Sequence, residues 1–188
     1  MADPIVLLGA ALTGFWLFFP AYLANPSAVL SGHGTPVDFG KEMGGKRILG
    51  DGKTWWGLIG GTLAGGFIGV IQMLLARPTG LPTFGTTLCA MMIPFILAFG
   101  SLFGDMLGSF IKRRLNVGRG AKAPILDQYD FVIGAFIVGL ILIPGFMLDT
   151  FLAGTAIAGL VMIIIVTPPL HRAVNIVGYK TGQKDVPW

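Results

Sequence analysis

The chain has 188 residues, of which 54% are hydrophobic and only 12% are charged, and its mean hydropathy is +0.78. A soluble domain carries roughly a quarter charged residues. This composition therefore excludes a soluble enzyme and predicts an integral membrane protein, with one polytopic domain over residues 1–188. The lone cysteine, Cys89, lies in an apolar run, so an intramolecular disulfide is excluded.

Five segments are suitable for membrane helices, which need about 20 mostly apolar residues. We predict spans at residues 5–23, 55–75, 83–103, 131–147 and 150–168. The links RPTGLP and LDT join the second span to the third and the fourth to the fifth, whereas long polar loops at about 24–54 and 104–130 join the others. The predicted fold class is an all-α integral membrane protein with five transmembrane helices.

The basic residues are distributed asymmetrically between the loops. With five spans the termini lie on opposite sides, and an outside N-terminus places both long loops and the C-terminal tail in the cytoplasm. Of the thirteen Lys and Arg residues, only Arg77 then lies outside. Since basic residues favour cytoplasmic loops, we predict an outside N-terminus, an inside C-terminus and polar chemistry on the cytoplasmic face.

Many of the 29 glycines lie within the predicted spans, as in GLIGGTLAGGFIG at Gly57–Gly69. Small residues at three- and four-residue spacing let membrane helices approach closely. We predict that these glycines pack helices together; a glycine-lined pore is the alternative.

The stretch GDGKT at Gly50–Thr54 resembles the end of a phosphate loop, but Arg47 occupies the position where that motif requires glycine. A membrane span follows, so this motif is excluded. The segment still concentrates Lys46, Arg47 and Lys53 among glycines. These cations either anchor the loop at the lipid surface or form a basic loop that meets a nucleotide phosphate or an anionic head group.

The segment PAYLANPSAVL at Pro20–Leu30 breaks the first span, and we predict a short helix lying at the interface. Within it, Asn25 is a candidate for a substrate contact. Because Asn before Pro often forms a turn, a purely local role is the alternative.

The stretch GDMLGSFIKRR at Gly104–Arg114 ends the third span. Asp105, Ser109 and Lys112 are spaced so that a continuing helix presents them on one face. An acid near membrane depth is a functional candidate by default. A carboxylate near the C-terminal end of a helix also opposes the helix dipole, so helix capping does not explain Asp105.

Two further acids open the fourth span in the stretch LDQYD. Asp127 and Asp130 are three residues apart, so they share a helix face. If the third and fourth spans are antiparallel neighbours, both converge with Asp105 at the cytoplasmic end. Mg²⁺ prefers carboxylate, phosphate and water oxygens, so the three acids predict a magnesium site. The alternative is a set of helix N-terminal carboxylates paired with the Lys112–Arg114 cations.

GDMLGSFIKRR followed by LDQYD resembles the signature region of the CTP-dependent lipid cytidylyltransferases. The five spans, PSAVL and GKRILGDGKTWWG are similar to the archaeal branch of that family, the CDP-archaeol synthases. The resemblance implies that CTP and an unsaturated archaeal ether-lipid phosphate, bis-geranylgeranylglycerol phosphate, give CDP-archaeol and pyrophosphate with Mg²⁺, in membrane phospholipid biosynthesis.

The resemblance also implies roles for individual residues. The expected metal ligands are Asp105, Asp127 and Asp130; the expected triphosphate contacts are Lys112 and Arg113, with Lys46, Arg47 and Lys53 from the first loop; Ser109 and Asn25 are expected polar contacts. Bacterial phosphatidate enzymes typically carry Arg where this chain has Gln128, so Arg113 or Lys122 is expected to replace that cation.

Three other readings compete with this one. The same chemistry on diacyl phosphatidate fits the residues equally well, and only the resemblance favours the ether lipid. A CDP-alcohol phosphotransferase would group its aspartates more closely on adjacent helical turns. A small channel or transporter would carry polar residues in mid-span, whereas here they lie near one face. Nucleic-acid binding is not needed to explain the lysines, and the oligomeric state stays open.

Overall fold

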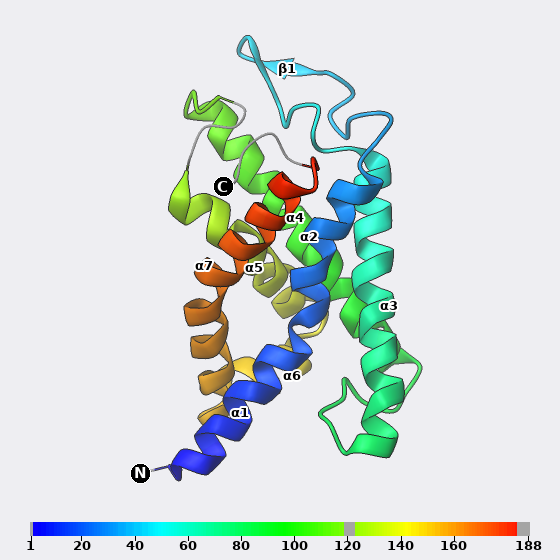
Figure 1. The fold of residues 1–188 in the computed structure, drawn as a ribbon, viewed down its shortest axis with the longest axis vertical. Helices are drawn as coiled ribbons and strands as arrows, with labels where there is room; N and C mark the ends of the chain where they lie inside the picture. The colour runs from blue at the N-terminus through cyan, green and yellow to red at the C-terminus, as the bar shows by residue number, and fades with distance from the viewer. Residues whose placement is uncertain (1, 119–122, 184–188) are drawn as a thin grey trace.

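Five helical segments of the computed structural model are long and apolar enough to cross a membrane, which confirms the predicted number of spans. The structure describes residues 2–118 and 123–183, so Lys122 lies outside the described residues. The helices are α1 (Pro4–Leu17), α2 (Phe19–Ser31), α3 (Trp55–Thr79), η1 (Cys89–Met92), α4 (Ile93–Arg114), α5 (Pro124–Leu142), α6 (Pro144–Met147), η2 (Leu148–Leu152), η3 (Gly154–Ala156) and α7 (Ile157–Lys180). Figure 1 shows them as an elongated bundle.

The first span is longer than predicted. Helices α1 and α2 follow each other with only Phe18 between them, and together they continue to Ser31. The predicted end at Leu23 and the separate interfacial helix are therefore wrong. Pro26 lies inside α2, where a proline removes a backbone hydrogen bond. Around this proline α2 packs closely along α3, with a Cβ on Gly61 only 2.6 Å from the Ala24 carbonyl oxygen, and sequence periodicity alone does not reveal this packing.

The third and fourth spans are also displaced from their predicted bounds. The third begins at Cys89 and its helix continues to Arg114, so GDMLGSFIKRR is helical throughout, as predicted. The fourth begins at Pro124, a residue that suits the first helical turn.

The fourth and fifth spans are not joined by a three-residue hairpin, and that prediction is wrong. Pro144 ends α5, because the residue before a proline is disfavoured in helical conformation and Ile143 has φ −138° and ψ 51°. The short segments α6, η2 and η3 then connect to α7, so LDT lies within a longer irregular connection.

Glycines bring the spans together, as predicted. A Cβ atom built on Gly61 would lie 2.6 Å from the Ala24 carbonyl oxygen of α2, and one on Gly65 would lie 2.5 Å from that of Pro20. On another face of α3, a Cβ on Gly66 would collide with the ring of Phe95 in α4. The stripe therefore allows α3 to pack closely against both neighbours.

Helices α4 and α5 are antiparallel neighbours, so the condition under which the three acids were expected to converge is met. A Cβ atom on Gly104 would lie 2.1 Å from the Asp130 carbonyl oxygen, and one on Gly134 would lie 2.3 Å from Gly104 Cα. Side chains larger than hydrogen are excluded at this crossing. The backbones of the two signature segments are therefore in close contact.

Aromatic rings fill the centre of the bundle. Phe18 and Phe151 are fully buried and their rings are perpendicular, with centroids 5.9 Å apart. Phe136 packs against both of them. Such edge contacts add to the apolar area that the rings bury, so this cluster connects the junction between α1 and α2 to α5 and η2.

Residues 32–54, here called the basic loop, are not helical. They include a hairpin of two short strands, β1 (Glu42–Met43) and β2 (Lys46–Arg47), which the all-α prediction missed. Thr54 ends the loop by capping α3, since its hydroxyl accepts a hydrogen bond from the Gly57 N–H at 3.1 Å. Figure 1 places β1 at the end of the bundle opposite to the start of α1.

Candidate active site

The predicted site residues gather at the end of the bundle that carries the basic loop. The C-terminal half of α4, the start of α5 and the basic loop all meet there (Figure 1). Three acids of α4 and α5 make the charged contacts at this end: Asp105, Asp127 and Asp130.

Asp130 is the most enclosed of the three acids, with 7% of the residue exposed. Its carboxylate lies against α4, because a Cβ atom on Gly108 would come within 2.3 Å of Asp130 Oδ2. Its Oδ1 accepts a hydrogen bond from the Phe131 N–H at 2.7 Å. The charges that act on this carboxylate include those of Asp105, Lys112 and Lys53. A buried carboxylate near another acid and two cations is typical of functional sites.

Asp105 faces the basic loop. Its Oδ2 accepts a hydrogen bond from Lys53 Nζ, and each side chain is about one quarter exposed. This ion pair joins the loop to α4 across 52 positions of sequence. The acid at the end of the third span is therefore matched by a cation that arrives from the first loop.

Asp127 has a different environment. Its Oδ1 accepts a hydrogen bond from Lys112 Nζ at 2.6 Å, and its Oδ2 accepts one from the Ala123 N–H at 2.9 Å. The second contact satisfies a backbone donor at the start of α5, so Asp127 also acts as a helix cap. The alternative weighed from the sequence, a helix-terminal carboxylate paired with Lys112, therefore describes a contact that Asp127 makes.

The described residues contain no group of three or more Asp, Glu, His and Cys side chains close enough to form a ready set of metal ligands. Asp105 and Asp130 nevertheless interact electrostatically. Mg²⁺ is usually held by one or two carboxylates together with phosphate oxygens and waters. The predicted magnesium site therefore stays a prediction, for which Asp105 and Asp130 are the candidate ligands.

Arg47 contacts carboxylates of its own loop. Its Nη2 donates to Asp38 Oδ1 at 2.9 Å, and its Nη1 donates to Asp51. Burial alone would raise the pKa of Asp38, but the hydrogen bonds from Arg47 and from backbone N–H groups outweigh burial and hold that pKa well below its usual range. The predicted contact of Arg47 with triphosphate stays a prediction, because its guanidinium is held within the basic loop here.

The remaining predicted residues surround this centre. Ser109 is buried in α4, one residue beyond Gly108. Arg113 donates to the Val117 carbonyl oxygen at 2.9 Å, and Asn25 donates to the Ser101 hydroxyl at 3.1 Å. Their roles toward a substrate stay predictions, as does that of Lys46, which lies in β2.

Sequence reasoning missed two residues that organise this end of the molecule. Asp38 is buried, and Arg114 donates to the carbonyl oxygens of Met43, Lys46 and Arg47. A signal existed for the first, because an Asp two residues before Gly favours a side-chain turn. Arg114 ends a basic run that membrane anchoring explains equally well, so its sequence carries no such signal.

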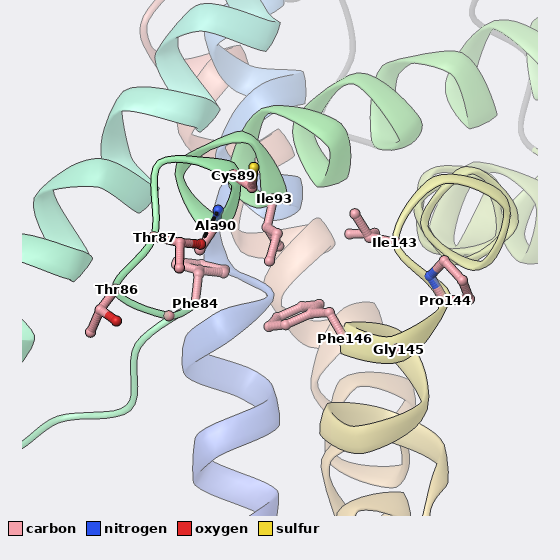
Figure 2. A pocket seen from close by; sticks show the side chains of 11 residues that line it. Phe84, Thr86, Thr87, Cys89, Ala90, Ile93, Ile143, Pro144, Gly145 and Phe146 are labelled. Atoms are coloured by element: carbon pink, nitrogen blue, oxygen red, sulfur yellow. Dashed lines mark hydrogen bonds between the residues drawn. The ribbon is translucent and has the colours of Figure 1, made fainter.

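A cavity of about 420 Å³ lies at the other end of the bundle. Figure 2 shows its lining, which includes Phe84, Ile93 and Phe146 and, among the residues that the structure describes, no charged side chain. A nucleotide triphosphate requires cations or metal around it, so this cavity is unsuited to the predicted chemistry. The candidate site is the charged end.

Sequence comparisons with known proteins identify the same enzyme family. A family model described as CarS-like, CDP-archaeol synthase, matches residues 6–188. The CDP-archaeol synthase of Picrophilus torridus is 47% identical over 180 residues, covering 94% of this chain and 96% of that protein. The CDP-archaeol synthase of Pyrococcus horikoshii is 44% identical over 181 residues, with 94% and 96% covered. The matched region includes the basic loop and the α4–α5 interface.

A solved structure is also similar. It is that of an intramembrane enzyme for archaeal membrane lipid biosynthesis, with a TM-score of 0.65 and 36% sequence identity. The match covers 88% of this chain and 94% of the solved chain. The arrangement of helices described above is therefore shared with an enzyme that works within the membrane.

Proposed function

The chain belongs to the CDP-archaeol synthase family, and we propose that its charged end is the active site and faces the cytoplasm. The protein is a multi-pass membrane enzyme, a CTP-dependent cytidylyltransferase. It transfers CMP from CTP to an unsaturated archaeal ether-lipid phosphate, bis-geranylgeranylglycerol phosphate, in membrane phospholipid biosynthesis. The products are CDP-archaeol and pyrophosphate.

One observation carries the assignment of the site. Asp130 lies against Gly108 at the α4–α5 crossing, and the charges of Asp105 and Lys112 on α4 and of Lys53 in the basic loop act on its carboxylate. This arrangement brings acid and cation together at the end of the spans. A lipid phosphate at the membrane surface and a soluble nucleotide can both reach such a place.

The reaction exchanges one bond at phosphorus for another. An oxygen of the lipid phosphate attacks the α-phosphorus of CTP and forms a new P–O bond. The bond from this phosphorus to the oxygen bridging to the β-phosphate breaks, and pyrophosphate leaves with the electron pair. Positioning and charge neutralisation contribute most of the catalysis in such displacements.

The cations of the site supply that neutralisation. Before substrate binds, Lys53 and Lys112 pair with Asp105 and Asp127. We assign both lysines to the triphosphate, together with Arg113 and, from β2, Lys46. In this assignment the acids position the ammonium groups until phosphate oxygens replace them as partners.

The donor set also fits Mg²⁺. Asp105, Asp127 and Asp130 each carry the hard carboxylate oxygens that this ion prefers; they do not form one preassembled group, but one or two of them suffice. When bound, the ion supplies Lewis-acid neutralisation of phosphate charge. The chain's own contribution is to fix Asp130 by packing against Gly108 and to leave Asp105 and Asp127 reachable from water.

Pyrophosphate release from CTP by the purified protein tests this function. We expect release that depends on Mg²⁺ and on bis-geranylgeranylglycerol phosphate. Diacyl phosphatidate is the matched comparison, because it has the same phosphate but ester-linked chains. Equal release with both lipids would retain the chemistry and discard the substrate preference. A folded protein that releases no pyrophosphate with either lipid would contradict the proposal.

A further inference from the structure

The basic loop is organised around one buried carboxylate. Asp38 accepts four hydrogen bonds: one from Arg47 Nη2 at 2.9 Å and three from backbone N–H groups, those of Gly40 at 3.1 Å, Leu49 at 2.9 Å and Gly50 at 3.0 Å. Its side chain is 1% exposed. A buried acid with this many donors is strongly stabilised in its charged form. The carboxylate therefore joins the start of the loop, at Gly40, to its later part, at Leu49 and Gly50.

The contacts of Asp38 continue to Lys53 through the backbone. Gly50, whose N–H donates to Asp38, accepts through its carbonyl oxygen a hydrogen bond from the Lys53 N–H at 3.2 Å. The Lys53 carbonyl oxygen accepts one at 2.7 Å from the N–H of Val37, the residue before Asp38. These bonds close a ring that fixes the backbone of Lys53. Its ammonium group meets Asp105 from that fixed position.

Gly50 is required at its place in this ring. Its φ is +102°, in a region that side-chain-bearing residues rarely adopt. The turn that leads from Asp38 back to Lys53 therefore depends on glycine as well as on the carboxylate.

A second anchor joins the same loop to α4. Arg114 donates to the carbonyl oxygens of Met43, Lys46 and Arg47, and its guanidinium lies over the Phe110 ring at 5.4 Å. The hairpin of the loop is thus attached to the helix that carries Asp105.

We propose that Asp38 is a positioning residue: with Arg47 as its partner, it holds the backbone turn that delivers Lys53 to Asp105 and to the triphosphate of CTP. This role rests on the function proposed above. It separates the basic residues of the loop into two groups. Arg47 belongs to the framework, and Lys53 is the cation that the framework presents to the substrate.

Kinetics of Asp38→Asn test this role. We expect kcat/KM for CTP to fall about tenfold, the scale of one hydrogen bond to a charged group. The change should be in KM for CTP, with KM for the lipid phosphate unchanged. Asp51→Asn is the matched control, because Asp51 also pairs with Arg47 but its side chain is 65% exposed. It should retain the kinetics of the unaltered protein.

A double-mutant cycle distinguishes positioning from a general structural effect. If Asp38 acts through Lys53, then Asp38→Asn adds no further loss in a Lys53→Ala background. Losses that multiply would contradict the proposal. Should Asp38→Asn fail to fold, Arg47→Gln removes only the side-chain partner and leaves the three backbone donors in place. The same non-additivity with Lys53→Ala is expected for it.

Zero-length carbodiimide cross-linking measures the proximity of Lys53 to Asp105 and does not depend on turnover. It converts a Lys–Asp ion pair to an amide, which mass spectrometry identifies. We expect the Lys53–Asp105 cross-link to fall several-fold in Asp38→Asn while the Lys112–Asp127 cross-link, measured in the same sample, stays constant. An unchanged Lys53–Asp105 yield would overturn the proposal. If the unaltered protein released no pyrophosphate, the proposed function would fail, yet this measurement would still decide whether Asp38 places Lys53.

Discussion

At one end of the bundle, ion pairs and hydrogen bonds connect the basic loop to α4 and α5. At the other end, Phe146 packs edge to face against Phe151 and at a tilt against Phe84, and Phe84 and Phe146 line an apolar cavity beside the irregular connection. Both ends connect the same spans. The contacts between them are charged at the first end and apolar at the second.

The difference follows from how each end is built. At the aromatic end, Pro144 stops α5, and apolar rings fill the space that the interrupted helices leave. At the charged end, α4 continues to Arg114 and glycine contacts hold it against α5, so acids on both helices lie close together. Bringing charges together in this way is costly unless they are paired or bind ligands. This cost is the reason for proposing the charged end as the binding site.

The largest expected effect is that of Asp130→Asn. This change keeps the shape of the side chain but removes the negative charge at the α4–α5 crossing. We expect turnover to fall by about 10³-fold or more, the scale of a single electrostatic group acting at a reacting phosphate. Pyrophosphate release measures turnover, and thermal unfolding in detergent checks that the fold is intact.

Asp149→Asn is the control for that substitution, because Asp149 is an exposed acid in η2, at the aromatic end. It should leave turnover unchanged. Substantial residual activity in Asp130→Asn would contradict the proposed role of its carboxylate. Acids at the charged end and at the aromatic end would then be equally dispensable for turnover.

Gly108→Ala sharpens the comparison by adding one carbon atom. That atom would approach Asp130 Oδ2 to 2.3 Å and displace the carboxylate. A displacement of about 1 Å at a reacting centre can cost about 10²-fold in rate. We expect such a loss in kcat, with the apparent affinity for the lipid retained.

Gly145→Ala adds the same carbon atom in α6, where no heavy atom lies within 4 Å of the new Cβ. It should leave both turnover and thermal stability unchanged. Equal losses in the two variants would show that the glycine effect is one of general helix packing and not of access to Asp130.

The spans and the shared helix face were predictable because hydropathy and helical period are local properties. Asp105 and Lys112 needed only a helix that continues beyond the apolar segment, and α4 does so. The end of the first span at Ser31 was not predictable. It depends on the close packing of α2 against the Gly61 region of α3, a contact between segments far apart in sequence.

The partners of the site residues were equally beyond local reasoning. Lys53 and Asp105 are 52 positions apart, and no periodicity connects a loop lysine to a helix acid. The spacing of Asp38 and Gly40 indicates only a local turn, whereas its contacts with Arg47, Leu49 and Gly50 come from 9, 11 and 12 positions away and leave no sequence signal. The sequence therefore predicted that Asp105, Lys112 and Asp127 lie at one end of the spans, but not which charges hold the loop; which of them face the substrate stays a prediction.

A smaller effect is expected from acid. Because the pKa of Asp38 is depressed in the folded protein, its contribution to loop stability is complete above the unfolded value of about 3.9. It is lost only as the pH falls through the lower folded value. Protection of the Leu49 and Gly50 amides from hydrogen exchange, corrected for intrinsic rates, should stay constant down to about pH 4 and decline below it. Loss of protection between pH 7 and pH 5 would contradict this assignment.

The smallest effect is expected at Cys89, an exposed thiol that lines the apolar cavity. It is the only cysteine of the chain, so a thiol reagent labels one known place. Attachment of a bulky maleimide should leave turnover unchanged, because the aromatic end contributes no group to the proposed chemistry. In sealed vesicles, a membrane-impermeant maleimide should react only from the face opposite to the one from which CTP is used. Labelling from the CTP side would place both ends of the bundle on the same side of the membrane. Spans that cross the membrane from one end to the other do not allow this, so the proposed topology would be wrong.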